Sequence, residues 1–144
     1  MSTCATSSRQ RRRLHAWALV FAVLGAAGPI MDVQAADASA QRYPDVVAVR
    51  VRASGPSRFD FDVTVSSPYD APARYADAFR VSSSGGTVHG ERRLLHDHAD
   101  EQPFTRDLYG VTIPAGVRKV VVQARDSTFG YGGKAVEVVL PGRN

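Results

Sequence analysis

Hydrophobic and polar residues alternate along most of the chain beyond residue 44. The pattern is clearest in Phe59–Val65, where Phe or Val at every second position is separated by Asp or Thr. A period of two is typical of a β-strand with one buried and one solvated face. Turn-forming Gly, Pro and Ser residues separate the alternating segments at short intervals, and the sequence of this region has no long segment of helical period.

This alternation predicts about seven strands and an all-β domain. The strands are expected at residues 45–52, 59–65, 79–82, 87–95, 109–113, 120–124 and 136–140. The apolar face of the first strand is expected to carry Val47, Val49 and Val51, and that of the fifth to carry Tyr109, Val111 and Ile113. Their lengths and spacing favour an antiparallel two-sheet sandwich of the immunoglobulin or fibronectin type III class, with a small barrel as the alternative. We expect the domain to occupy residues 44–141, after a flexible lead-in at residues 36–43.

Residues 1–35 differ in character from the rest of the chain. Four arginines between residues 9 and 13 precede an apolar run from Leu14 to Met31, and Val33-Gln34-Ala35 follows. A basic start, an apolar core and a small-x-small exit are the parts of a secretory signal peptide. A membrane anchor is less favoured, because the run contains Gly and Pro and is shorter than the ~20 residues of a membrane-spanning helix.

We therefore expect export, with cleavage after Ala35 as the first choice and after Ala40 as the second. The mature protein would lie in the periplasm or outside the cell, with no stable membrane insertion once the signal is removed. The single cysteine, Cys4, precedes the apolar run, so no cysteine stands where a lipoprotein signal requires one. The exported domain would also contain neither a disulfide nor a thiol for redox chemistry.

Removal of the signal changes the charge that matters. The whole chain has 18 Lys and Arg against 14 Asp and Glu, a net charge of +4. Residues 1–35 contain four Arg and one Asp, so the remainder has 14 basic and 13 acidic residues and a net charge of +1. Because a clustered basic surface is the electrostatic requirement for nucleic-acid binding, we expect no nucleic-acid partner.

Five short segments of the domain are rich in acidic, aromatic, histidine or glycine residues. These are Ala76–Phe79, His96–His98, Asp100–Arg106, Ala124–Ser127 and Gly130–Gly133. With these segments the chain resembles a group of small exported bacterial single-domain proteins without an assigned activity, over nearly the whole domain. The resemblance implies export and a single domain. It implies no function and assigns no functional residue.

The strongest polar cluster of the sequence contains His96 and His98. In an extended chain, alternate residues point to the same side, so both imidazoles can approach one ion. Glu101 is the expected third ligand, with Asp100 and His89 as alternatives. Imidazole and carboxylate ligands suit Cu(II) or Zn(II), which makes binding of a divalent metal the first functional hypothesis. The alternative is a polar loop in which the same side chains hold the backbone by hydrogen bonds.

A second hypothesis comes from the expected topology. In a seven-stranded sandwich, residues 66–77, 96–106 and 126–133 would lie in loops at one end. Aromatic and acidic side chains on such loops can bind a protein or glycan partner. The candidate ligand-binding residues are Tyr69, Asp70, Asp126, Phe129 and Tyr131.

Catalysis is not expected. Ser127 follows an aspartate, but no Gly-x-Ser-x-Gly elbow marks it as a nucleophile. We expect a monomer that binds rather than turns over its ligand. The two hypotheses make different demands, because a metal site requires both imidazoles to face one point, whereas an interaction module requires exposed aromatic faces.

Overall fold

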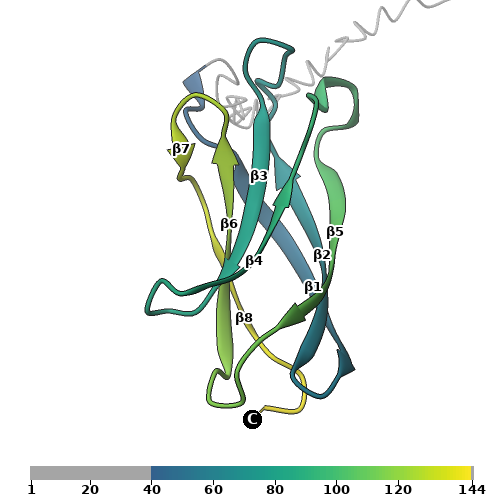
Figure 1. Cartoon of the computed structure of the whole chain (residues 1–144). Coiled ribbons are helices and arrows are strands. Elements are labelled where there is room, and N and C mark those ends of the chain that lie inside the picture. Colours follow the sequence, from purple (N-terminus) through teal and green to yellow (C-terminus); the bar gives the residue numbers. More distant parts are fainter. Residues whose placement is uncertain (1–39, 144) are drawn as a thin grey trace, which may run out of the picture. The chain divides into compact units, whose positions relative to one another are not determined.

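The computed structural model describes residues 40–143, and Figure 1 shows their arrangement. The expected signal peptide and residues 36–39 of the lead-in lie outside the described residues. Within the described part, eight strands and one short 3₁₀ helix make up the regular structure, so the predicted all-β class is confirmed. In the same part of the chain, no helix is long and apolar enough to cross a membrane.

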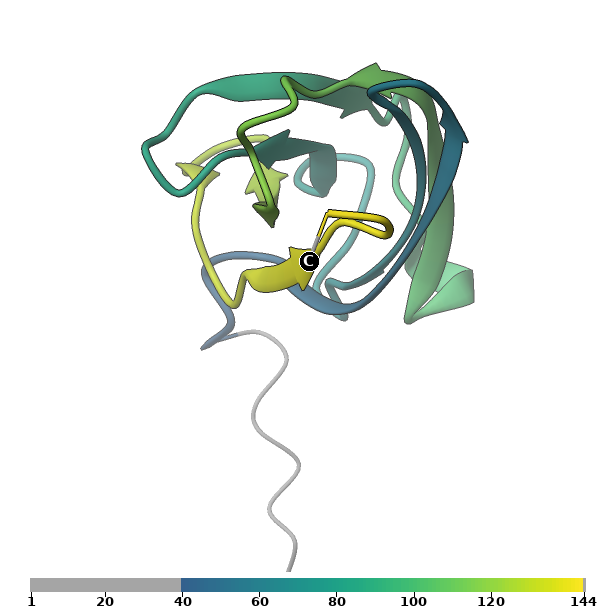
Figure 2. The ribbon, with the colours of Figure 1, turned by 90° about the horizontal axis from the view of Figure 1, so that it is seen from below.

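The strands form two antiparallel sheets. Their bounds are β1 (Asp45–Gly55), β2 (Arg58–Ser66), β3 (Ala76–Ser82), β4 (Val88–Arg93), β5 (Phe104–Thr112), β6 (Lys119–Asp126), β7 (Gly130–Tyr131) and β8 (Val136–Val139), with the 3₁₀ helix η2 (Ala99–Glu101) before β5. One sheet has the order β1-β2-β5; the other has the order β4-β3-β6-β7, and β8 also pairs with β6. Figure 2 shows the two sheets enclosing the interior, which confirms the predicted sandwich.

The core lies between the sheets because each long strand buries alternate side chains. On β2, Phe59, Phe61, Val63 and Val65 are buried while the residues between them are partly exposed. The opposite sheet contributes further buried apolar side chains from β3 and β6. Burial of apolar surface is the main favourable term in folding, and this domain relies on it without a disulfide. The largest fully buried apolar side chains are Phe61, Phe79, Phe104, Ile113 and Leu140.

Two irregularities change the face that a predicted core residue occupies. The β1–β2 register shifts between Val46 and Ala48, so Val46 is fully buried and Val47 is 43% exposed. Tyr109, which was expected to share a face with Val111, is 63% exposed, and the adjacent Gly110 has a φ of +64°. The prediction was wrong at Val47 and Tyr109, because a bulge adds a residue and reverses the alternation beyond it.

The predicted last strand is β8, and the short strand β7 precedes it within the segment 126–133 that was expected to be a loop. Residues 132–135 separate them, at the point where the beginning of β1 crosses. The amide of Val46 donates to the carbonyl of Lys134 (2.8 Å), and the amide of Lys134 donates to Asp45 Oδ1 (2.7 Å). These bonds join the start of the first sheet to the edge of the second.

Candidate functional site

Hydrogen bonds tie two long loops together at one end of the sandwich. The buried Asp70, in the β2–β3 loop, accepts from the amide of Ala76 through Oδ1 and from the amide of His98 through Oδ2, both at 3.0 Å. The side chain of Gln102 accepts from the amide of Ser67 at 2.7 Å. Asp70, a candidate ligand-binding residue, thus uses both oxygens to fix the backbone of β3 and of the β4–β5 loop.

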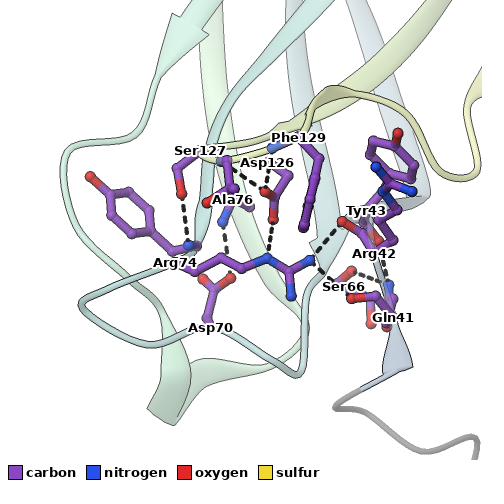
Figure 3. A network of polar contacts seen from close by, with 12 residues as sticks. Gln41, Arg42, Tyr43, Ser66, Asp70, Arg74, Ala76, Asp126, Ser127 and Phe129 are labelled. Atoms are coloured by element: carbon purple, nitrogen blue, oxygen red, sulfur yellow. Dashed lines mark hydrogen bonds and ion pairs between the residues drawn. The ribbon is translucent and has the colours of Figure 1, made fainter.

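The third loop joins this end through Asp126, which Figure 3 shows at the centre of a polar network. Its fully buried carboxylate accepts from the amides of Thr128 (2.8 Å) and Phe129 (2.9 Å) and from Arg74 Nε (3.0 Å). Burial alone would raise the pKa of Asp126. The nearby Tyr69 hydroxyl, the two amides and Arg74 outweigh that effect and hold the pKa below its ordinary value.

Arg74 connects this network to the lead-in. It donates from Nη2 to the carbonyls of Gln41 (3.0 Å) and Arg42 (2.6 Å), as Figure 3 shows. Its guanidinium carbon lies 4.0 Å from the centre of the Tyr69 ring and 4.9 Å from that of Phe129. Tyr69 and Phe129, both predicted to bind a ligand, therefore contact an arginine that holds the N-terminal end of the domain.

Tyr131 contacts side chains on the outer face of the second sheet. Its hydroxyl donates to Glu91 Oε2 at 2.7 Å, and the Arg80 guanidinium carbon lies 3.8 Å from the ring centre. Burial, followed by the hydrogen bond to Glu91, raises the pKa of Tyr131 above its ordinary value. The structure therefore brings Tyr131 into a network separate from that of Asp126.

The structure brings His96 and His98 together, with ring centres 4.7 Å apart and ring planes 30° apart. His98 is 3% exposed and stacks on Phe104 at 4.0 Å. Its Nδ1 is buried and has no hydrogen-bond partner within residues 40–143. Burial, then the positive charge of Arg106, then His96 lower the pKa of His98.

The third predicted metal ligand faces an arginine. Glu101 Oε1 accepts from Arg106 Nη2 at 2.8 Å, and this bond lowers the pKa of Glu101 against a smaller opposing effect of burial. In the described part of the chain, no group of three or more His, Cys, Asp or Glu side chains is placed to hold a metal ion. The metal site remains a prediction, and the geometry shows the two imidazoles paired without a third ligand beside them.

A pocket of about 170 Å³ opens beside the two histidines, where the end of β4 approaches the start of β5. We call it the seam pocket. Its lining residues are Arg92, Arg93, Leu94, Leu95, His96, His98 and Arg106. The sequence pattern did not single out Arg92, Arg93 or Leu95, although they shortly precede the His-x-His segment. Their closeness to this segment in the sequence was the signal that could have identified them.

The seam pocket is rich in positive charge. Its arginines pair with nearby carboxylates: Arg106 with Glu101 (2.8 Å), Arg92 with Asp107 (3.6 Å) and Arg93 with Asp77 (3.9 Å). Asp77 also pairs with Arg125. Four guanidinium groups thus share three carboxylates in these ion pairs, and the buried carboxylate of Asp70 also lies beside His98.

Fold and pocket together define a small all-β domain with one end organised by loops. A relative named Putative lipoprotein, from Halomicrobium mukohataei, is 38% identical over 97 residues. The match covers 67% of this chain and 47% of the relative, so the chain spans about half the length of the curated relative it matches. No family model matches the chain, and no solved structure matches it.

Proposed function

We propose that this chain is an exported, non-catalytic binding protein that holds its ligand in the seam pocket. The observation that carries the proposal is the environment of His98. This residue is only 3% exposed and lines the pocket, and its Nδ1 has no hydrogen-bond partner among the described residues. Buried polar groups are normally hydrogen-bonded, so an unpartnered one on a residue that lines a pocket is a candidate ligand contact.

Export is supported by the signal-like pattern of residues 1–35 and by the name of the relative, which describes that protein as a lipoprotein. Cleavage after Ala35 or Ala40 would leave Gln41, which Arg74 holds, as part of the mature chain. The test is the mass of the protein recovered from a secreting bacterial host. A start at Ala36 or Gln41 supports export, and an uncleaved chain in the cytoplasm contradicts it.

Binding without turnover is supported by the contacts of Ser127, the residue considered above as a nucleophile, because its hydroxyl already takes part in a hydrogen bond to the backbone. Ser127 Oγ accepts from the amide of Tyr75 (3.2 Å), and Tyr75 O accepts from the amide of Ser127 (2.9 Å). The neighbouring Asp126 holds backbone amides and Arg74 rather than an imidazole. These contacts favour a structural role for the Asp126-Ser127 pair.

The ligand site is tested by nuclear magnetic resonance of the purified protein with four defined probes: ZnCl₂, CuCl₂, sodium phosphate and sodium hexanoate. Paramagnetic Cu(II) is read through signal broadening and the others through shifts. We expect at least one probe to change the signals of His98 and of residues 92–96 saturably. If all four leave these signals unchanged, the seam pocket is not a binding site of this kind and the proposal fails.

Metal binding remains the second candidate because the imidazoles of His96 and His98 are neighbours. Ring-nitrogen lone pairs lie in the ring plane, so two nearly parallel rings direct them side by side rather than to one point. The test is calorimetric titration with Cu(II) and Zn(II) of the parent and of His96→Ala, which removes an exposed imidazole. One-site binding that is lost in the variant would establish the metal site, and unchanged weak binding would exclude it.

A further inference from the structure

The seam pocket combines three arginines with the buried His98 in its lining. Two other hollows of the described region, lined by Arg118 with Arg143 or with Lys119, are also cationic but contain no buried side chain. The hollow on the outer face of β1-β2-β5 has a volume of about 290 Å³ and contains both Arg50 and Asp62 in its lining. The seam pocket is lined by three arginines and two histidines and by no carboxylate. The carboxylates that pair with these arginines lie outside the lining, so the groups that face a ligand are cationic or neutral.

The hydrogen-bonding capacity of these arginines is largely unused inside the domain. A guanidinium carries five N–H donors. Arg106 donates to Glu101 and to the carbonyl of Thr105, and Arg92 donates to the carbonyl of Asp107. The side chain of Arg93 makes no hydrogen bond to another described residue, and its nearest carboxylate oxygen is 3.9 Å away. Most of these N–H groups are therefore free to donate to an additional oxygen.

The two walls of the pocket are held at a fixed separation. Arg92 on β4 donates across to the backbone of β5 at 3.2 Å. A Cβ at Gly90 would lie 3.1 Å from a methyl carbon of Val111, which shows how closely β4 approaches β5. Figure 1 shows these two strands belonging to different sheets. The three arginines therefore extend from strands rather than from loops.

From these observations we infer that the seam pocket binds an oxyanion group, a carboxylate or a phosphate, through Arg92, Arg93 and Arg106. This inference rests on the proposed function, because it names the ligand chemistry of that same site. The planar guanidinium fork matches both carboxylate and phosphate oxygens. A volume of about 170 Å³, roughly that of five or six water molecules, admits such a group but not a whole drug-sized ligand.

Leu95 adds an apolar element to this site. Its side chain is 84% exposed and lines the pocket beside the histidines. An anionic ligand that also carries an aliphatic stem would cover Leu95 and gain from its burial. A carboxylate on a short alkyl chain combines both features, whereas inorganic phosphate offers only the oxyanion.

The experiment compares phosphate, acetate and hexanoate by nuclear magnetic resonance titration of the purified protein. The variants are Arg93→Gln, Arg106→Gln and the control Arg50→Gln, which removes the same charge from the outer face of β1. Loss of a charge-assisted contact should weaken anion binding by about tenfold or more in the two pocket variants and leave the control near the parent. Arg93→Gln removes an exposed side chain and is not expected to affect folding.

The outcomes separate the two claims. Tighter binding of hexanoate than of acetate, reduced by Leu95→Ser, identifies a carboxylate with an apolar stem as the ligand class, whereas tighter binding of phosphate identifies a phosphate. Binding of Zn(II) or Cu(II) at the pocket without any anion overturns this inference and leaves the proposed function intact. Equal anion affinity in all Arg variants also overturns it, and no response to any probe overturns both.

Discussion

Replacement of Asp126 by Asn removes a buried charge without changing the size of the side chain. The parent carboxylate accepts three hydrogen bonds, two from backbone amides and one from Arg74 Nε. In Asp126→Asn, the side-chain oxygen can keep the two backbone hydrogen bonds only if the NH₂ group faces Arg74. Two hydrogen-bond donors then face each other without an acceptor. The opposite orientation would keep Arg74 paired and lose both backbone bonds.

The magnitude follows from the burial of the two partners. Removing one member of a fully buried ion pair costs about 3–5 kcal/mol. The Arg74 side chain is 27% exposed and keeps the carbonyls of Gln41 and Arg42 as acceptors, so part of its charge stays solvated. We therefore expect a loss of about 2–3 kcal/mol, which corresponds to a decrease in Tm of about 10–15 °C for a domain of this size.

The assay is urea and thermal unfolding of the parent, Asp126→Asn and the control Asp62→Asn. Asp62 faces Arg52 at 3.7 Å on the exposed side of β2, so its replacement should change stability by less than about 0.5 kcal/mol. Equal stability of the two variants would refute the assignment of Asp126 as the organising charge of the loop end.

The same pair of proteins gives a pH test. The folded-state pKa of Asp126 is below the ordinary value of 3.8, so its carboxylate contributes stability that is complete above the unfolded pKa. That contribution is lost as the pH falls through the lower, folded-state pKa. The stability gap between parent and Asp126→Asn should therefore narrow below about pH 4, and a gap that is constant from pH 7 to pH 3 would contradict the linkage.

Two further substitutions test how the lead-in is held. Arg74→Lys cannot reach both Asp126 and the two lead-in carbonyls, so we expect a loss of about 1–2 kcal/mol and faster amide hydrogen exchange in the lead-in, measured by mass spectrometry. Gly132→Ala places a Cβ 2.3 Å from the ring of Tyr43, so we expect a loss of about 1–3 kcal/mol in urea unfolding. In the Tyr43→Ala background that clash is absent, so Gly132→Ala should cost much less there, and an undiminished loss would be inconsistent with the clash.

The sequence predicted the fold class because the alternation of period two is a local signal. Phe59–Val65 alternates without interruption, and the structure buries the expected face of β2. The prediction was wrong where one extra residue entered a strand pair. Val47 and Tyr109 lie beside such register changes, which depend on the partner strand and are invisible in the sequence of either strand alone.

The candidate site was harder to predict, because its character depends on contacts between distant segments. The sequence identified His96 and His98 as neighbours but could not place Arg106 of β5 beside them. It also could not distinguish a loop carboxylate that faces solvent from one that accepts backbone amides. Asp70 and Asp126 belong to the second kind, and their bonds organise the loop end.

The carboxylates around the seam pocket also limit the ligands that can use it. An incoming oxyanion must share the arginines with Glu101 and Asp107, which already neutralise part of their charge. Binding should therefore depend on charge attraction, and raising the salt concentration from about 0.05 to 0.5 M should weaken it because exposed charges are screened over a few ångströms. Glu101→Gln frees Arg106 and should strengthen anion binding at low salt. Weaker anion binding in Glu101→Gln would contradict this prediction, because it would mean that Glu101 assists the ligand instead of competing with it for Arg106.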